Sequence, residues 1–113
     1  MSMAALVNHI RTLIAADTSL SGLKLGLVDY GIPKKVPAIY IDAISDTDDK
    51  LSKQTFNLCY VTSDMALEQF DVARSIKLAI QQSHCIQAQG LLPRPEVDRN
   101  RWIIPCEFFP SRL

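Results

Sequence analysis

The sequence predicts an α+β (α/β) fold, in which a mixed, mostly antiparallel sheet of four to five strands carries two helices on one face. In two separate stretches, apolar residues recur every three or four positions, which is typical of amphipathic helices. In other stretches apolar and polar residues alternate, which is typical of half-buried strands. The chain has 113 residues, about the size of one domain. We therefore expect residues 1–113 to form a single domain with the element order α-β-β-β-α-β-β.

The N-terminal stretch predicts the first helix. Its apolar residues are spaced so that they share one side of a helix; they are Met3, Leu6, Val7, Ile10, Leu13 and Ile14. The polar cluster Asp17–Gly22 contains residue types that end helices and form turns. Alternating leucines then predict a short strand over residues 23–28. A loop from Tyr30 to Pro37 should follow, because its two prolines cannot donate to a ladder.

The middle of the chain predicts an antiparallel hairpin with a long, charged tip. Ala38–Ile44 and Thr55–Thr62 both read as strands, and the segment Ser45–Lys53 between them is too polar for a core. In the first strand the isoleucines should anchor the sheet to the helices. The alternate residues Tyr40 and Asp42 should look outward, because successive side chains of a strand point to opposite faces.

A second, longer helix is predicted over Met65–Gln82. Ser63 or Asp64 is expected to be its N-cap, since short polar side chains accept hydrogen bonds from free N–H groups there. Its buried stripe should comprise Leu67, Phe70, Ala73, Ile76 and Ile80. Arg74 and Lys77 should lie on the solvent side.

The C-terminal third predicts two paired strands. His84–Gln89 and Arg101–Phe109 should pair across the turn-rich segment Gly90–Asn100. Pro105 lies inside the second of these strands. Because proline has no backbone N–H, we expect an edge position or a bulge there.

Composition argues against several classes of protein. Lysine and arginine (12) balance aspartate and glutamate (12), and the pI is about 6.7. Nucleic-acid binders usually carry a basic excess, so we expect no specific nucleic-acid binding. Three separated cysteines fit a reducing cytoplasm. The N-terminal run does not have the pattern of a signal peptide, and no apolar run approaches the length of a membrane span. We therefore expect a soluble, intracellular protein with no membrane partner.

The residue types that bind metals or act as nucleophiles do not form a motif. The soft ligands are spread too widely for a zinc site; they are His9, Cys59, His84, Cys85 and Cys106. Buried packing explains the cysteines at 59 and 106. The acidic segment Ser45–Lys50 has the composition of a calcium loop but lacks its glycine and final glutamate. We expect no metal and no cofactor, and a solvated hairpin tip.

The order of the elements and several segments resemble the tail terminators, a family of minor tail proteins from lambda-like, long-tailed bacteriophages. The resemblance spans most of the chain. It rests on the N-terminal helix, the long charged hairpin loop, the single long helix and the segments Gly31–Pro33, Val36–Asp42, Phe56–Thr62 and Arg101–Phe108.

The resemblance implies a structural protein of virion assembly and not an enzyme. Such a phage or prophage subunit forms a hexameric ring on the finished tail tube and ends tube polymerisation. It then offers a docking surface to the head–tail connector. The implied partners are further copies of the chain, the tail tube protein and the connector protein, although the subunit can be monomeric in isolation. The implied location is the host cytoplasm during assembly and then the virion tail.

A ring of this kind needs a heterologous interface, in which one patch of a subunit meets a different patch of the next. We expect the sheet edge and loop tips to provide it. Candidates for the loop that faces the lumen or tube are Asp46, Asp48, Asp49, Lys50 and Lys53. Candidates for partner contacts are Lys34, Lys35, Arg94, Arg99, Arg101 and Trp102.

Two other classes of function remain open. The first is a small α/β ligand-binding or regulatory module, which needs a concave apolar pocket with a few convergent polar groups. The second is a nuclease or hydrolase that holds magnesium with Asp42, Asp46 and Asp48. No lysine or histidine on a rigid element accompanies these carboxylates, so the sequence favours the enzyme least.

Overall fold

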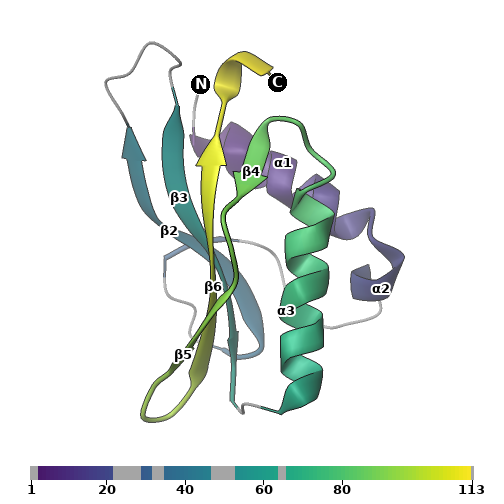
Figure 1. The fold of residues 1–113 in the computed structure, drawn as a ribbon, viewed down its shortest axis with the longest axis vertical. Coiled ribbons are helices and arrows are strands. Elements are labelled where there is room, and N and C mark those ends of the chain that lie inside the picture. The colour runs from purple at the N-terminus through teal and green to yellow at the C-terminus, as the bar shows by residue number, and fades with distance from the viewer. Residues whose placement is uncertain (1–2, 22–28, 32–34, 47–52, 64–65, 113) are drawn as a thin grey trace.

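The computed structural model describes residues 3–21, 29–31, 35–46, 53–63 and 66–112. In this part of the chain, six strands form one sheet in the order β1-β2-β3-β6-β4, and β5 pairs with β6 beside β4 (Figure 1). Strand β1 runs parallel to β2, and every other pair is antiparallel. The strands are β1 (Asp29–Tyr30), β2 (Ala38–Asp46), β3 (Gln54–Thr62), β4 (Ile86–Ala88), β5 (Leu92–Pro95) and β6 (Asn100–Phe108). The α+β prediction is confirmed.

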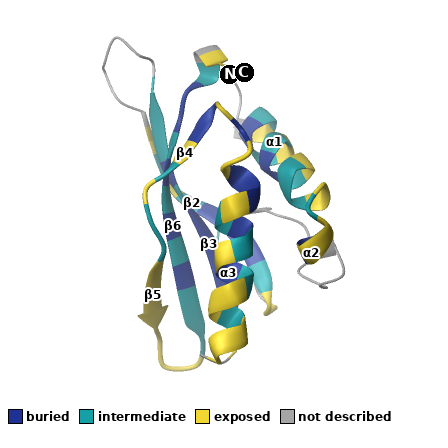
Figure 2. Cartoon of the chain, turned by 45° about the vertical axis from the view of Figure 1, so that its right-hand side comes forward, coloured by how far each residue is buried: buried dark blue, intermediate teal, exposed yellow. Residues whose placement is uncertain are grey.

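The helices cover one face of this sheet. They are α1 (Met3–Ala15), α2 (Thr18–Ser21) and α3 (Leu67–Ile80), and a 3-10 turn, η1 (Pro110–Arg112), follows the last strand. Figure 2 shows α1 and α3 on the same side of the strands. Their apolar sides and the inner face of the sheet form the main core, which includes Leu6, Ile10, Ile39, Ile41, Phe56, Leu58, Ile76, Ile80, Ile104 and Phe108.

The hairpin predicted in the middle of the chain is β2–β3. Its register places Ile39 opposite Tyr60 and Ile41 opposite Leu58, and β6 continues both rows on the far side of β3. Because residues in register share a face, these rows form one continuous apolar surface of the sheet that faces the helices. The isoleucines of β2 are fully buried there, as predicted.

A bulge interrupts β2 near its end. Asp42 pairs with Asn57 but Ser45 pairs with Thr55, so β2 contributes one extra residue. Ala43 takes up the irregularity with φ 54°, a left-handed conformation that is costly for a residue with a Cβ. The extra residue lets Ile44 rejoin the core face, where it packs against the main cluster.

Replacement of Ala43 by glycine should stabilise the protein slightly. The left-handed conformation costs an L-residue roughly 1–2 kcal/mol, and the extra entropy of glycine in the unfolded chain offsets part of that gain. We expect the free energy of unfolding in urea to rise by up to about 1 kcal/mol. A loss of stability in Ala43→Gly would show that the bulge does not strain this residue.

Strand β6 is interior, so the edge position expected for Pro105 is wrong. The expected irregularity is present in the partner strands: from Ala88–Cys106 to Leu92–Ile103 the β4–β5 side has one residue more than β6. β6 pairs continuously with β3 on one side and with β4 and β5 on the other. The Pro105 carbonyl accepts a hydrogen bond from the Gln89 N–H at 2.8 Å. In an antiparallel strand the N–H and C=O of one residue point the same way, so the missing N–H faces the break between β4 and β5. The missing N–H of Pro105 therefore removes no hydrogen bond between β6 and β3.

The segment predicted to be turn-rich contains a strand, β5. Its register pairs Leu92 with Ile103 and Arg94 with Arg101, and beyond it the Glu96 N–H donates to the Arg99 carbonyl at 2.8 Å. Every second residue from 92 to 96 therefore points its N–H toward β6. The intervening residues are the two prolines at 93 and 95, which face the outer edge without a donor. This edge of the sheet is closed to a further strand there.

Helix α3 begins later than predicted. Its N-cap is Ala66 without a side-chain hydrogen bond, so the expected cap at Ser63 or Asp64 is wrong. The buried stripe begins only at Ala73, and the predicted core residues Leu67 and Phe70 are exposed. The first two turns of α3 therefore present apolar side chains outward, because they extend past the wider part of the core.

Three predictions concern the segment before β1, Tyr30 and Tyr40. The strand expected over residues 23–28 lies outside the described residues. Tyr30, expected in a loop, belongs to β1 instead, where it pairs with Ile41. Tyr40 does not look outward into solvent: it is 1% exposed, in a second cluster on the sheet face away from the helices.

Candidate functional site

The sheet face away from the helices carries a small second cluster. Its buried members are Tyr40, Cys59 and Val61, which lie side by side on β2 and β3 because their register aligns them. Ala38 and Ile103 pack against this group. A helix-free sheet face would ordinarily be polar, so this apolar centre distinguishes the face from a simply solvated one.

Arg101 binds two carboxylates beside this cluster. Its Nε lies 3.1 Å from Glu96 Oε1, and its Nη2 donates to Glu96 Oε2 at 3.5 Å. Its Nη1 lies 4.0 Å from Asp42 Oδ2, and its guanidinium carbon lies 5.7 Å from the centre of the Tyr40 ring. The side chain is only 16% exposed. Arg101 therefore joins the turn after β5 to the bulged end of β2.

Burial suppresses the acidity of the thiols. It raises the pKa of Cys59 from its ordinary value of 9.0 to about 12, and the Asp42 carboxylate acts in the same direction. Burial also raises the pKa of Cys106 to about 12 and the pKa of Tyr40 above its ordinary value. Since the thiolate is the reactive form, these cysteines are packing residues at neutral pH and not nucleophiles.

These raised pKa values predict loss of stability in alkali. Between the pKa of an unfolded thiol, 9.0, and the folded value of about 12, the unfolded state binds fewer protons. The stability that each buried, protonated thiol contributes is therefore fully present below about pH 9. It is lost as the pH rises toward 12. Urea unfolding across this range should show the decline. The variant Cys59→Ala should show a shallower slope, and an unchanged slope would contradict the assignment.

Strand β5 and the turn into β6, residues 92–100, form a protruding segment that we call the arm. It lies at the lower end in Figure 1, and Figure 2 colours β5 as exposed. Leu92 is 56% exposed, and Val97 in the turn is fully exposed. Arg94 is exposed and stands directly opposite Arg101. Within the described residues no carboxylate pairs with Arg94, so two arginines face each other with only one of them neutralised.

The first two turns of α3 form the second exposed surface. We call it the helix patch; it comprises Leu67, Glu68, Phe70 and Asp71, and Leu67 is 83% exposed. The Phe70 ring contacts the buried Trp102 ring edge-on, with 5.9 Å between the ring centres. This contact fixes one side of the patch to the sheet. In the part of the chain that the structure describes, neither carboxylate of the patch forms an ion pair. The patch is therefore apolar and acidic.

Of the residues predicted to line a lumen loop, the structure fully describes one, Lys53. The side chain of Asp46 and the residues Asp48, Asp49 and Lys50 lie outside the described residues. Lys53 is described, and its Nζ pairs with Glu107 Oε2 at 3.1 Å. This pair ties the base of the hairpin tip to β6.

The predicted partner contacts divide into exposed and buried residues. Lys34 lies outside the described residues, whereas Lys35 and Arg94 are exposed. Arg99 lies 3.6 Å from Asp98 in the turn of the arm. Trp102 is 4% exposed and belongs to the main core, so it packs within the subunit, as Arg101 largely does. Of this set the structure brings Arg94 and Arg101 together on one sheet face.

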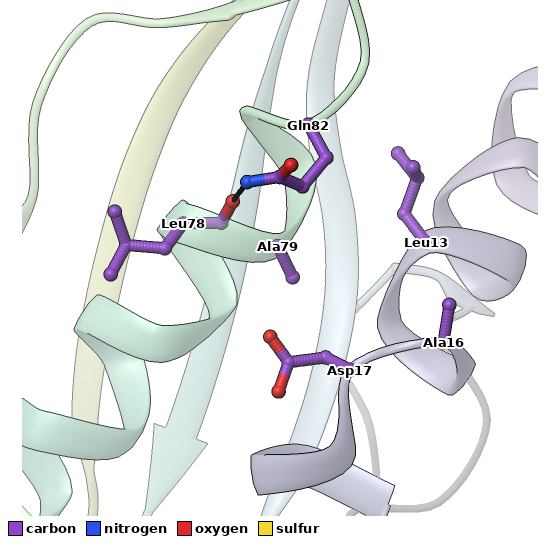
Figure 3. A pocket seen from close by; sticks show the side chains of 6 residues that line it. All are labelled: Leu13, Ala16, Asp17, Leu78, Ala79 and Gln82. Atoms are coloured by element: carbon purple, nitrogen blue, oxygen red, sulfur yellow. Dashed lines mark hydrogen bonds between the residues drawn. The ribbon is translucent and has the colours of Figure 1, made fainter.

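A shallow pocket of about 220 Å³ lies between the end of α1, the start of α2 and the last turns of α3 (Figure 3). The Asp17 carboxylate points toward it and accepts hydrogen bonds from the Ser19 hydroxyl at 2.5 Å and N–H at 2.9 Å. These bonds, the hydroxyl's first, lower the pKa of Asp17. The remaining lining is mainly apolar: Leu13, Ala16, Leu78, Ala79 and Gln82.

Among the described residues no three His, Cys, Asp or Glu side chains gather as a metal site would require. No described helix is long and apolar enough to cross a membrane. Neither a family model nor a curated protein matches the chain.

The sequence interpretation missed the helix patch and the strand in the arm. Helical spacing could not reveal the helix patch, because Leu67 and Phe70 have the spacing of the buried residues and were therefore predicted to be buried. For the arm a signal was present: prolines at alternate positions in Leu92–Pro95 are compatible with an edge strand whose prolines face outward.

Proposed function

We propose that the chain is a structural subunit of a phage or prophage tail. It closes into a hexameric ring on the finished tail tube, ends tube polymerisation and offers the head connector a docking surface. The proposal rests on the family resemblance, and the fold supports it: a helix, a long antiparallel hairpin, a single long helix and a closing strand occur in the expected order.

One observation carries the proposal furthest. The subunit is elongated, 41 × 30 × 22 Å, and its two ends are unlike (Figure 1). One end carries the end of β2, the start of β3 and η1, and the other carries the arm and the start of α3. A capping ring must meet the tube on one side and the connector on the other, and unlike ends of one subunit fit that requirement.

Electron microscopy tests the proposal directly. Assembled tubes of the tail tube protein encoded by the same phage or prophage are incubated with the chain and imaged. We expect an added ring with six-fold symmetry at one end of each tube. Tubes with two unaltered ends, at saturating concentrations of the chain, would contradict the proposal.

The pocket beside Asp17 favours a second candidate, a small ligand-binding or regulatory module. Ligand pockets are usually about 300–1,000 Å³. At about 220 Å³ this one is smaller, and one carboxylate is the main polar group that faces it. A strictly monomeric chain whose melting temperature rises with a small ligand, and which does not bind tubes, would support this candidate.

A further inference from the structure

Arg94 on the arm is exposed and has no ion-pair partner among the described residues of the subunit. Its register partner is Arg101, whose charge is already shared between Glu96 and Asp42. A carboxylate from outside the subunit would give Arg94 a partner. The apolar side chains of Leu92 and Val97 flank this position, so the matching surface should be both acidic and apolar.

The helix patch has this chemistry. Glu68 and Asp71 lie three positions apart on the outer side of α3, where they are neighbours on the helix surface. Leu67 and Phe70 stand beside them as exposed apolar groups. The arm and the helix patch are therefore complementary in charge and alike in apolar content.

The two surfaces of one subunit cannot meet each other. Arg94 and Leu92 share the sheet face of Arg101 and Ile103, which belongs to the second cluster. Helix α3 packs on the opposite face, against the main core. Contact between the surfaces must therefore join two subunits, and repetition of such a heterologous contact gives a ring or a filament.

The arm is built for side-chain contact and not for strand addition. The outer edge of β5 carries prolines at both outward positions and has no N–H donor there. The prolines also restrict the backbone of β5, which reduces the entropy lost when a partner binds.

We propose that the arm of one subunit packs on the helix patch of the next, with Arg94 between Glu68 and Asp71. The occupant of the helix patch is thus a second copy of this chain. This inference rests on the proposed ring and identifies the surfaces that close it.

Charge exchange tests the contact. Self-association of the purified chain is measured by sedimentation velocity for the wild type, Arg94→Glu, Asp71→Arg, the double variant and an equimolar mixture of the two single variants. Each single reversal should weaken association by at least about tenfold. The double variant and the mixture should both recover it, because each restores opposite charges across the contact. Gln81→Glu, an acidic change at an exposed position outside both surfaces, should have no effect on association.

Thermal melting is the control that each variant is folded. Arg94→Glu places a carboxylate opposite Arg101 and should not lower the melting temperature, so lost association cannot be attributed to unfolding. The inference is wrong if the single reversals associate like the wild type or if the exchange fails to restore association. It is also wrong if the wild type stays monomeric at millimolar concentration.

The outcomes separate this contact from the proposed function. Charge-dependent association without capping of tubes would uphold the contact and reject the tail terminator. Capping that survives both single reversals would uphold the function and reject the contact.

Discussion

Leu58→Ala is expected to lower the free energy of unfolding by about 4 kcal/mol, because its side chain is central to the main core. Leu58 lies on the middle strand, β3, between Ile41 and Ile104 in register, and all three residues are 0% exposed. Two neighbouring strands and the helices hold the walls of the resulting cavity, so little of it can collapse. A domain of this kind has a total stability of roughly 5–15 kcal/mol, so the loss is a large part of it.

Urea unfolding followed by circular dichroism measures this change. Leu92→Ala is the matched control, because the same truncation at an exposed site on β5 should change stability by no more than about 0.5 kcal/mol. Equal effects of the two truncations would contradict the description of β3 as the centre of the core.

Arg101→Ala should be the next most damaging single change, with a loss of about 2 kcal/mol. The substitution leaves the half-buried Asp42 carboxylate without its cation and removes both guanidinium contacts to Glu96. It also uncovers the Tyr40 ring. Glu96 lies near the surface and can turn to water, which keeps the loss below that of a fully buried ion pair.

Two comparisons make this prediction specific to the geometry. Arg101→Lys keeps the charge but not the planar fork, and should lie between the wild type and Arg101→Ala. Arg94→Ala, across the ladder, should be close to neutral, because Arg94 is exposed and has no ion-pair partner among the described residues. Amide exchange in residues 92–96 should accelerate in Arg101→Ala, since Arg101 anchors the turn of the arm. A loss no greater than that of Arg94→Ala would contradict this role.

The sequence predicted the centre of the fold well and its margins less well. The alternation in β2 and β3 is strong because one face of each strand packs under the helices, so position and pairing followed directly. The first turns of α3 were misread because helical spacing gives the side that residues share and not where the core ends. Leu67 continues the period of Ala73 and Ile76 but lies beyond the packed region.

Tyr40 and the arm show a second kind of limit. Alternation placed Tyr40 on the face away from the helices, but its burial depends on Cys59 and Arg101, which come from other strands. The pairing of Arg94 with Arg101 likewise depends on the register between β5 and β6. Such neighbours are far apart or ambiguous in sequence, so the candidate surfaces could be recognised only in the folded chain.

The length that tail tubes reach during assembly shows whether the chain acts as a tail terminator. The tail tube protein of the same phage or prophage is polymerised with increasing amounts of the chain, and tube lengths are measured by electron microscopy. We expect that tubes stop growing once capped and do not resume when tube protein is added. Tubes that continue to elongate at saturating concentrations of the chain would contradict it.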